Sequence, residues 1–326
     1  MKGFLAHKEP GKKPFYGIGS WDLTSLIDIP SDSFFVSDFE KKSCYFFSLE
    51  EEWNKKQSFS FFYKKDNSVL SLDKNSYLDK LSDFQCGFDE FHIEKAIFSR
   101  ISLHKKSDEI GSLEIFEDLC QRYGDEAFVY LISDKSFGTW IGATPEVLVK
   151  GDKNTLYSMA LAGTKSDDSI PWTDKEYEEQ KIVSDYMKEV ISSLKPSFFK
   201  EKVVKSVKNG AVFHLRTDFE FSLPNKKWNN LIDKLHPTPA VCGLPLDNSS
   251  TYISRHEPHD RLFYTGIIGR KSDSKISVYV NLRCMQVLEN YFALYLGGGI
   301  TKKSNPLEEW EETISKSQTL LSVFEK

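Results

Sequence analysis

Adjacent pairs of alternating segments are the feature that most limits what this chain can fold into. Residues 275–282 and 291–296 alternate strongly between apolar and polar side chains, and a similar pair lies at 128–133 and 139–150. Two further candidate strands lie near residues 211–221. Alternation with a period of two is typical of β-strands, and strands joined by short turns pair in antiparallel fashion. The sequence therefore predicts antiparallel sheets and excludes the regular strand–helix alternation of a doubly wound fold.

Helical patterns separate these strand pairs. Four helices are predicted, at residues 111–123, 174–194, 228–235 and 306–324. The second stops just before a proline and the last begins with one, and both are positions where helices accept proline. The short alternating run at residues 58–63 predicts a further strand in the first part of the chain. Helices that flank antiparallel sheets define an α+β chain.

Composition excludes several classes of protein. The 326 residues are 40% hydrophobic and 28% charged, which allows a sizeable core and excludes wholesale disorder. Forty-three Lys and Arg against 48 Asp and Glu give a net charge of −5, so no basic excess favours nucleic acid as a partner. The most apolar stretches are short, and residues 1–9 meet charge before any long apolar run. We therefore predict a soluble, cytoplasmic protein without a membrane span or a signal peptide.

The sequence supports neither a disulfide framework nor a zinc site, although the cysteines and residues 256–260 suggest them at first sight. The five cysteines are odd in number, far apart and without a CxxC pair, so free and mostly buried thiols are predicted. Residues 256–260, His-Glu-Pro-His-Asp, look like a ligand cluster, but the HExxH zinc motif needs a different spacing on a continuous helix. Pro258 would break that helix, and we set zinc aside.

Lys95 stands within an apolar strand pattern. On a strand, it shares one face with four aliphatic residues, Ile93, Ile97, Ile101 and Leu103. Desolvation among aliphatic side chains favours the neutral amine, which could act as a base. A lysine at a strand end that reaches back to water is the other interpretation, and the pattern alone favours it.

Glu179 heads an apolar stripe near the start of the predicted helix at 174–194. Val183, Tyr186 and Val190 follow it on the same face. A carboxylate in the first turns favours the helix dipole and is common there. A carboxylate that faces inward can instead be a metal ligand or a site acid. The sequence leaves both interpretations open.

The last predicted helix is apolar on two sides. One stripe holds Trp310, Ile314, Leu321 and Phe324. The opposite side holds Glu309, Glu312 and Lys316, together with Leu320 and Val323. Such a helix is usually packed between layers, so its charged first turns could line a cavity and bind a hard cation through oxygen. A solvated acidic face with a Glu312–Lys316 pair is the alternative, and the pattern alone favours it.

Three glycines, Gly297, Gly298 and Gly299, follow the alternating run at 291–296. Glycines after a strand let the backbone approach a ligand closely and leave N–H groups free to hold an anion. No GxGxxG or Walker pattern accompanies them, so alone they are weak evidence.

Together with their neighbours, and in this order, these features resemble the chorismate-utilising enzymes. That family comprises isochorismate synthases, salicylate synthases and the large subunits of anthranilate and aminodeoxychorismate synthases. The motifs that carry the resemblance are Gly142-Ala143-Thr144-Pro145-Glu146, Ala160-Leu161-Ala162-Gly163-Thr164-Lys165, His214-Leu215, His236-Pro237-Thr238-Pro239-Ala240-Val241-Cys242-Gly243-Leu244-Pro245, Glu257 through Arg261 to Tyr264 and Gly266, Leu282-Arg283, the triple glycine, and Glu309-Trp310-Glu311-Glu312-Thr313. The resemblance implies antiparallel β-sheets packed as a sandwich with flanking helices. It also implies a single domain of residues 1–326, with 1–88 as a divergent N-terminal part of the sandwich and 89–326 as the catalytic core.

The resemblance also implies roles for individual residues. Glu179 and Glu312 would bind Mg²⁺, which holds the ring carboxylate of chorismate, and Glu309 would lie in the outer shell of that ion. Lys95 matches the general base of the members that use water as nucleophile. Glu146 matches the general acid that protonates the departing hydroxyl. The matched substrate-binding positions are Ala162, Gly163, Thr164, His214, Arg283, Gly297, Gly298, Gly299 and Lys316.

Within the family, isochorismate synthase is the expected activity. Lys95 favours water over ammonia, and the chain length and Ala240 favour this type. Such an enzyme adds water at ring carbon 2, loses the hydroxyl of carbon 4, and feeds menaquinone or siderophore synthesis. Salicylate synthase is the alternative, followed by an aminating enzyme or a chorismate-binding protein without turnover. The last is considered because Tyr177 and Glu311 replace arginines that are usual in the family. We expect chorismate as the small-molecule partner and no nucleic acid, membrane or obligate protein partner.

Overall fold

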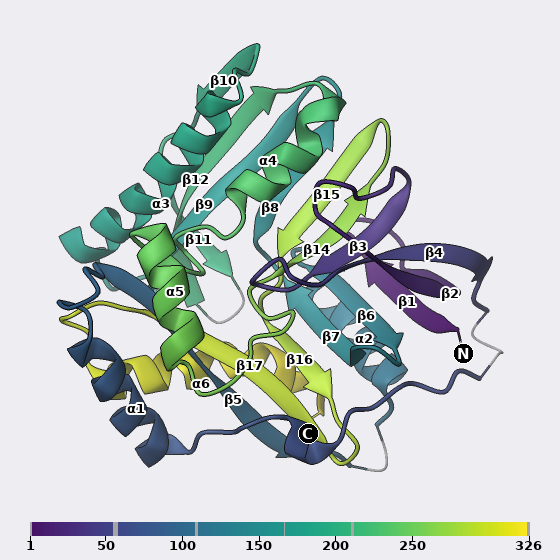
Figure 1. Cartoon of the computed structure of the whole chain (residues 1–326), viewed down its shortest axis with the longest axis horizontal. Helices are drawn as coiled ribbons and strands as arrows, with labels where there is room; N and C mark the ends of the chain where they lie inside the picture. Colours follow the sequence, from purple (N-terminus) through teal and green to yellow (C-terminus); the bar gives the residue numbers. More distant parts are fainter. Residues whose placement is uncertain (1, 55–57, 108–109, 166, 210–211, 325–326) are drawn as a thin grey trace.

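The computed structural model describes residues 2–54, 58–107, 110–165, 167–209 and 212–324 (Figure 1). The strands of these ranges are β1 (Gly3–Lys8), β2 (Phe15–Thr24), β3 (Ser33–Ser37), β4 (Cys44–Glu52), β5 (Lys95–Lys105), β6 (Phe128–Asp134), β7 (Gly138–Thr144), β8 (Val147–Asp152), β9 (Leu156–Lys165), β10 (Phe198–Glu201), β11 (Lys205–Asn209), β12 (Val212–Ser222), β13 (Gly243–Leu244), β14 (Ile267–Lys271), β15 (Lys275–Val280), β16 (Cys284–Val287) and β17 (Tyr291–Ile300). The α-helices are α1 (Lys74–Cys86), α2 (Ser112–Tyr123), α3 (Asp174–Ser193), α4 (Trp228–Leu235), α5 (Leu246–His256) and α6 (Pro306–Phe324).

The strands join through antiparallel pairings into one continuous order. That order is β13–β5–β17–β16–β7–β6–β1–β2–β4–β3–β14–β15–β8–β9–β12, with β10 and β11 both paired to β12. The strands β1–β4 link the two halves of the order, because β1 pairs with β6 and β3 pairs with β14. We therefore propose that residues 1–88 belong to the same domain as the rest of the chain.

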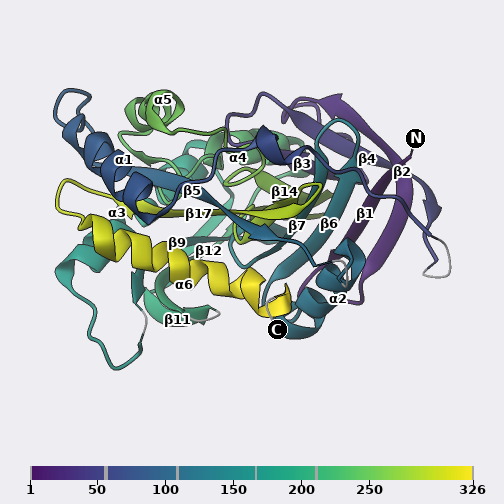
Figure 2. The same cartoon turned by 90° about the horizontal axis from the view of Figure 1, so that it is seen from below.

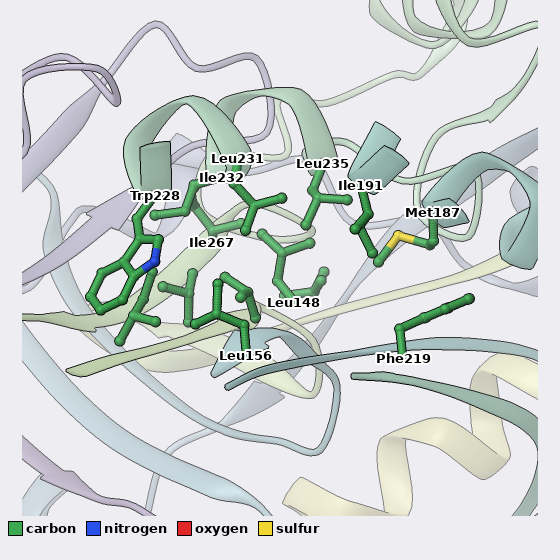
Figure 3. Packing of buried hydrophobic residues seen from close by; sticks show 14 of the residues in the cluster. Leu148, Leu156, Met187, Ile191, Phe219, Trp228, Leu231, Ile232, Leu235 and Ile267 are labelled. Atoms are coloured by element: carbon green, nitrogen blue, oxygen red, sulfur yellow. The ribbon is translucent and has the colours of Figure 1, made fainter. Parts of the chain in front are cut away.

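Hydrophobic clusters lie between the two halves and outside each of them. Along β6, Phe128 and Tyr130 face the shared cluster, whereas Val129 faces the cluster beneath α2 and α6. Along β14, Ile268 faces the shared cluster and Ile267 faces the cluster beneath α3 and α4. Figure 3 shows this last cluster, with side chains of α3 and α4 over those of β8, β9 and β14. Both faces of each half are thus buried, and the predicted α+β sandwich with flanking helices is confirmed.

The four predicted helices are confirmed as α2, α3, α4 and α6, and α6 lies along β17 on the outer side of its layer (Figure 2). The sequence interpretation missed α1 and α5. A capping signal for α1 was present, since the Asp73 side chain accepts a hydrogen bond from the backbone N–H of Ser76 (2.8 Å). No helix in the described ranges is both long and apolar enough to cross a lipid bilayer.

The strand predicted at residues 58–63 is wrong, because these residues form no strand. Phe59 and Phe61 instead pack on the ring of Phe4, with centroids 4.9 and 5.3 Å apart. The backbone N–H of Phe62 donates to a side-chain hydroxyl of β6 rather than to a neighbouring strand. The alternating aromatic residues therefore pack against the core here, but the segment forms no ladder of strand hydrogen bonds.

Three other strand predictions change in detail. The run at 139–150 is divided into β7 and β8 at Pro145, which has no N–H to contribute to a ladder. One strand, β12, covers the region near 211–221, and Ala211 lies outside the described residues. The three glycines belong to β17 instead of following it, and they pair with residues 97–99 of β5.

Candidate active site

A pocket opens among β9, β12 and β17, with α3 and α6 at its edge. It holds about 820 Å³ of empty space, counted out to its open mouth. Its lining includes most of the residues predicted for the site, namely Glu146, Ala162, Gly163, Thr164, Glu179, His214, Arg283, Gly297, Gly298, Gly299, Glu312 and Lys316. The other two lie directly beside the glycines of β17, Lys95 at Gly299 and Glu309 at Gly298. Residues from distant parts of the sequence therefore meet at one place.

Lys95 is the first residue of β5 and is only 5% exposed. Its Nζ forms an ion pair with Oε1 of Glu179 on α3. A Cβ on Gly299 would lie 2.6 Å from Cε of Lys95, so only a glycine here leaves space for the lysine side chain. Lys95 is thus buried and paired within the site, and the interpretation that it reaches back to water is wrong. Glu179, for which two interpretations were open, faces inward.

Glu312 and Lys316 face the pocket from successive turns of α6. Lys316 Nζ lies 2.6 Å from Glu312 Oε1 and donates to the carbonyl of Gly297 (2.8 Å). Burial tends to raise the pKa of Glu312, but the ammonium of Lys316 more than offsets this, and the pKa lies below its ordinary value. Arg283 donates to the carbonyl of Lys316 (2.8 Å). The predicted pair thus exists, but it lines a pocket, and the interpretation of a solvated acidic face is wrong.

Glu309, Glu312 and Glu179 supply carboxylate oxygens, which are the ligands that Mg²⁺ prefers. A Cβ placed on Gly298 would lie 2.9 Å from Oε2 of Glu309 and 3.8 Å from Oε1 of Glu312. Burial and the nearby Glu312 raise the pKa of Glu309 to about 7, as expected where carboxylates gather without enough positive charge. The donor set therefore fits a hard divalent cation, although no three ligands converge on a ready-made site among the described residues.

Glu146 lies in the turn between β7 and β8 and is 5% exposed. Burial raises the pKa of its carboxyl to about 8, and Lys316 opposes the shift only in part. The turn is fixed by the backbone, because Val280 N–H donates to the carbonyl of Glu146 (3.0 Å). Glu146 is therefore protonated at pH 7 and can donate a proton inside the pocket.

The wall formed by β9 and β12 presents a neutral imidazole. Nδ1 of His214 lies 2.8 Å from the carbonyl of Gly163 and 3.2 Å from Oγ1 of Thr164. Because a carbonyl only accepts, Nδ1 carries the proton and Nε2 is left as an acceptor. Burial lowers the pKa of His214 to about 4, so the ring is uncharged at pH 7. Gly163 has φ +72°, a conformation that suits glycine.

The sequence interpretation assigned no role to several residues that shape the pocket. Ile97, Tyr264 and Tyr295 also line it. Tyr264 was part of a quoted motif, which was the available signal, whereas Ile97 and Tyr295 were indistinguishable from ordinary core residues.

A buried ion pair behind the pocket was also missed. Arg261 and Glu257 contact each other at 2.7 Å, and the side chain of each is 3% exposed. Arg261 donates to the carbonyls of Ile97 (2.9 Å) and Val241 (2.8 Å), while Glu257 accepts from the backbone N–H of Ser99 (2.7 Å). The carboxylate in the set-aside zinc motif therefore pairs with the arginine that holds the pocket-lining backbone of Ile97 and Val241 in place.

Comparison with protein families decides the classification. The family model described as "Chorismate binding enzyme" matches residues 41–325. The chain belongs to the chorismate-binding enzymes. The resemblance that the motifs indicated is thereby confirmed.

The chorismate-binding chain is similar to curated isochorismate synthases. It is 32% identical over 201 residues to isochorismate synthase EntC of Escherichia coli K12, covering 57% of this chain and 51% of that protein. It is 31% identical over 256 residues to isochorismate synthase DhbC of Bacillus subtilis, covering 71% and 63%. These matches thus span between about half and two thirds of the length of the curated relatives.

Solved structures share the fold over nearly the whole chain. The menaquinone-specific isochorismate synthase MenF of Escherichia coli superimposes with a TM-score of 0.82 at 18% identity, covering 99% of this chain and 88% of that one. Anthranilate synthase component I of Streptococcus pneumoniae gives 0.71 at 14% identity, covering 97% and 89%. At these identities the likeness establishes the fold alone.

Proposed function

We propose that this chain isomerises chorismate to isochorismate by adding water at ring carbon 2 with loss of the hydroxyl at carbon 4. The observation that carries the proposal is a carboxyl in the pocket that holds its proton at pH 7, together with a buried lysine directly beside the pocket-lining Gly299. Addition of water requires a base, and departure of a hydroxyl requires an acid. The similarity to relatives named isochorismate synthases supports the same reaction.

Glu146 is assigned the role of general acid. Hydroxide is a poor leaving group, so a proton must reach the oxygen on carbon 4 as its bond to the ring breaks. A carboxyl whose pKa lies near 8 retains that proton at neutral pH, unlike an exposed glutamate. Within the described residues no side chain pairs with Glu146, so its proton is available to a ligand in the pocket.

Lys95 is assigned the role of general base toward water. Its buried position fixes the amine beside Gly299, and Glu179 holds it in place until the substrate arrives. Water is deprotonated as it attacks carbon 2, and positioned bases typically contribute about 10²- to 10⁴-fold to such a step. An amine in this place distinguishes water addition from attack by ammonia.

The remaining polar groups suit a substrate with two carboxylates. Arg283 and Lys316 are cationic, and the backbone of residues 297–299 lines the pocket without side chains in the way. A neutral His214 can contact the ring side without adding charge. We assign Arg283, Lys316 and the β17 backbone to carboxylate binding, and Ala162, Gly163 and Thr164 to the opposite wall.

Glu179 and Glu312 would hold Mg²⁺, with Glu309 in its outer shell. When bound, the ion would neutralise the ring carboxylate and orient the ring. The oxygen donors and the raised pKa of Glu309 support this assignment.

A product assay tests the proposal. Purified protein is incubated with chorismate, with and without Mg²⁺ and without ammonia. The products are separated by chromatography and identified by mass spectrometry. The proposal predicts a product isomeric with chorismate that forms only with Mg²⁺. Salicylate with pyruvate would assign the chain to the lyase branch, and no turnover would overturn the proposal. Relatives include both menaquinone-specific and vibriobactin-specific synthases. The proposal therefore names isochorismate as the product and leaves open whether it feeds menaquinone or siderophore synthesis.

A further inference from the structure

The two carboxylates proposed to bind the metal directly are each paired with a lysine of the same site. Glu179 is paired with Lys95, and Glu312 with Lys316 at 2.6 Å. The side chains of the lysines are 6% and 19% exposed, and those of the glutamates are 28% and 29% exposed. Both ion pairs are partly buried, so water screens their charges poorly and each ammonium strongly attracts its carboxylate.

The third carboxylate of the group lacks such a partner. Glu309 forms no ion pair with a lysine or arginine in the described part of the chain, and Glu312 is the charge that acts on it most strongly. Three carboxylates thus face two ammonium groups along the glycines 297–299. The site has the donors for a divalent cation, yet its two inner donors are already neutralised.

We propose that Lys95 and Lys316 act as tethered counter-ions that compete with Mg²⁺ for Glu179 and Glu312. This inference rests on the proposed function, because it takes these two glutamates as the metal ligands. An ammonium and a divalent cation cannot share one partly buried carboxylate without strong repulsion. Loading of the metal therefore requires that both ion pairs open.

Opening the pairs also frees the two amines for the substrate. Lys316 already reaches the carbonyl of Gly297, so a small movement turns its ammonium toward a substrate carboxylate. Lys95, released from Glu179, remains held by its stem beside Gly299, which lines the pocket. Lys95 becomes a base once its released ammonium has given its proton to solvent, so the event that loads the metal presents the anion anchor and frees the lysine to act as base.

Calorimetric titration with MgCl₂ alone, in the absence of chorismate, tests the competition. Lys95→Met and Lys316→Met keep most of the side-chain volume and remove the charge. Each is expected to lower the Kd for Mg²⁺ by roughly five- to tenfold relative to wild type, in line with the loss of a partly buried ion pair. Lys188→Met is the matched control, since Lys188 pairs with Glu201 at 2.9 Å on the exposed surface and its loss changes net charge equally. It should leave the Kd unchanged.

Equal Mg²⁺ affinity in Lys95→Met, Lys316→Met and Lys188→Met, with unchanged melting temperatures, would overturn the inference. A second measurement uses wild-type protein and does not depend on a variant folding. Reductive methylation followed by mass spectrometry should label Lys95 and Lys316 faster when Mg²⁺ is present, and Lys188 at the same rate. No increase at either lysine would contradict the competition. Failure of the proposed function would appear separately, as absence of Mg²⁺-dependent isomerisation in the wild-type product assay.

Discussion

Glu312 of α6 and Glu146 of the β7–β8 turn line the same pocket, but their surroundings shift their pKa values in opposite directions. Glu312 has an ammonium at 2.6 Å and a pKa below its ordinary value. Glu146 has no charge partner at contact distance in the described structure, and burial raises its pKa to about 8. The difference teaches that one residue type can serve as a metal ligand or as an acid, depending on whether a cation lies within reach.

The largest expected effect concerns the lysine that neutralises the α3 carboxylate. Lys95→Ala should lower kcat by about 10³-fold or more, because water loses its base. Mg²⁺-dependent binding of chorismate should remain detectable by calorimetry, since the carboxylates and anchors are intact. A fully active Lys95→Ala enzyme would remove the proposed base.

Removing the acid tests the other side of the comparison. Glu146→Gln preserves shape but cannot supply a proton as a carboxyl does, and kcat should fall by roughly 10²- to 10³-fold. The Kd for Mg²⁺ should change little, because Glu146 is not among the proposed ligands. Loss of metal affinity with retained turnover would reverse the roles assigned to the two kinds of carboxylate.

A third variant sharpens the role of α6. Glu312→Gln should raise the Mg²⁺ concentration for half-maximal activity by about tenfold or more, because the amide is a weaker donor than a carboxylate. Glu309→Gln is the comparison variant, and its shift should be smaller, since the outer shell contacts the ion through water. Unchanged Mg²⁺ dependence in Glu312→Gln would end its assignment as a ligand.

The pH profile is expected to show the smallest effect. Glu146 is active when protonated, so kcat/KM should fall as pH rises through its pKa of about 8. Between pH 8.5 and 9.5 the decline should approach tenfold, as ionisation of a single group requires. The basic limb should vanish in Glu146→Gln. A profile that rises through this range would mean that the ionised carboxylate is the active form.

How much of the site could be predicted from the sequence depended on whether its contacts are local. The Glu312–Lys316 pair follows from a spacing of four residues on a helix. The Lys95–Glu179 pair joins β5 to α3 across 84 positions, and no periodicity indicates which strand and helix meet. The family motifs brought these residues together before any geometry was known.

The fold shows the same division. The helix at 306–324 was recognised from its apolar spacing, but it lies on the outer side of the β17 layer and leaves Ile314 of one predicted stripe exposed. The glycines were placed after the strand rather than in it, because a strand segment without side chains has no alternation to detect. Their place in β17 is determined by β5, with which they pair, and by the lysine and carboxylates that occupy the space a Cβ would need.

The central claim is that the buried amine takes a proton from solvent water as it attacks carbon 2, while the buried carboxyl protonates the hydroxyl that leaves carbon 4. Turnover of chorismate in H₂¹⁸O with Mg²⁺, followed by mass spectrometry of the product, tests this most directly. The account predicts an isomer of chorismate that carries a single ¹⁸O on carbon 2. An isomer without label would mean that the original hydroxyl migrates, and it would contradict the separate roles of Lys95 and Glu146.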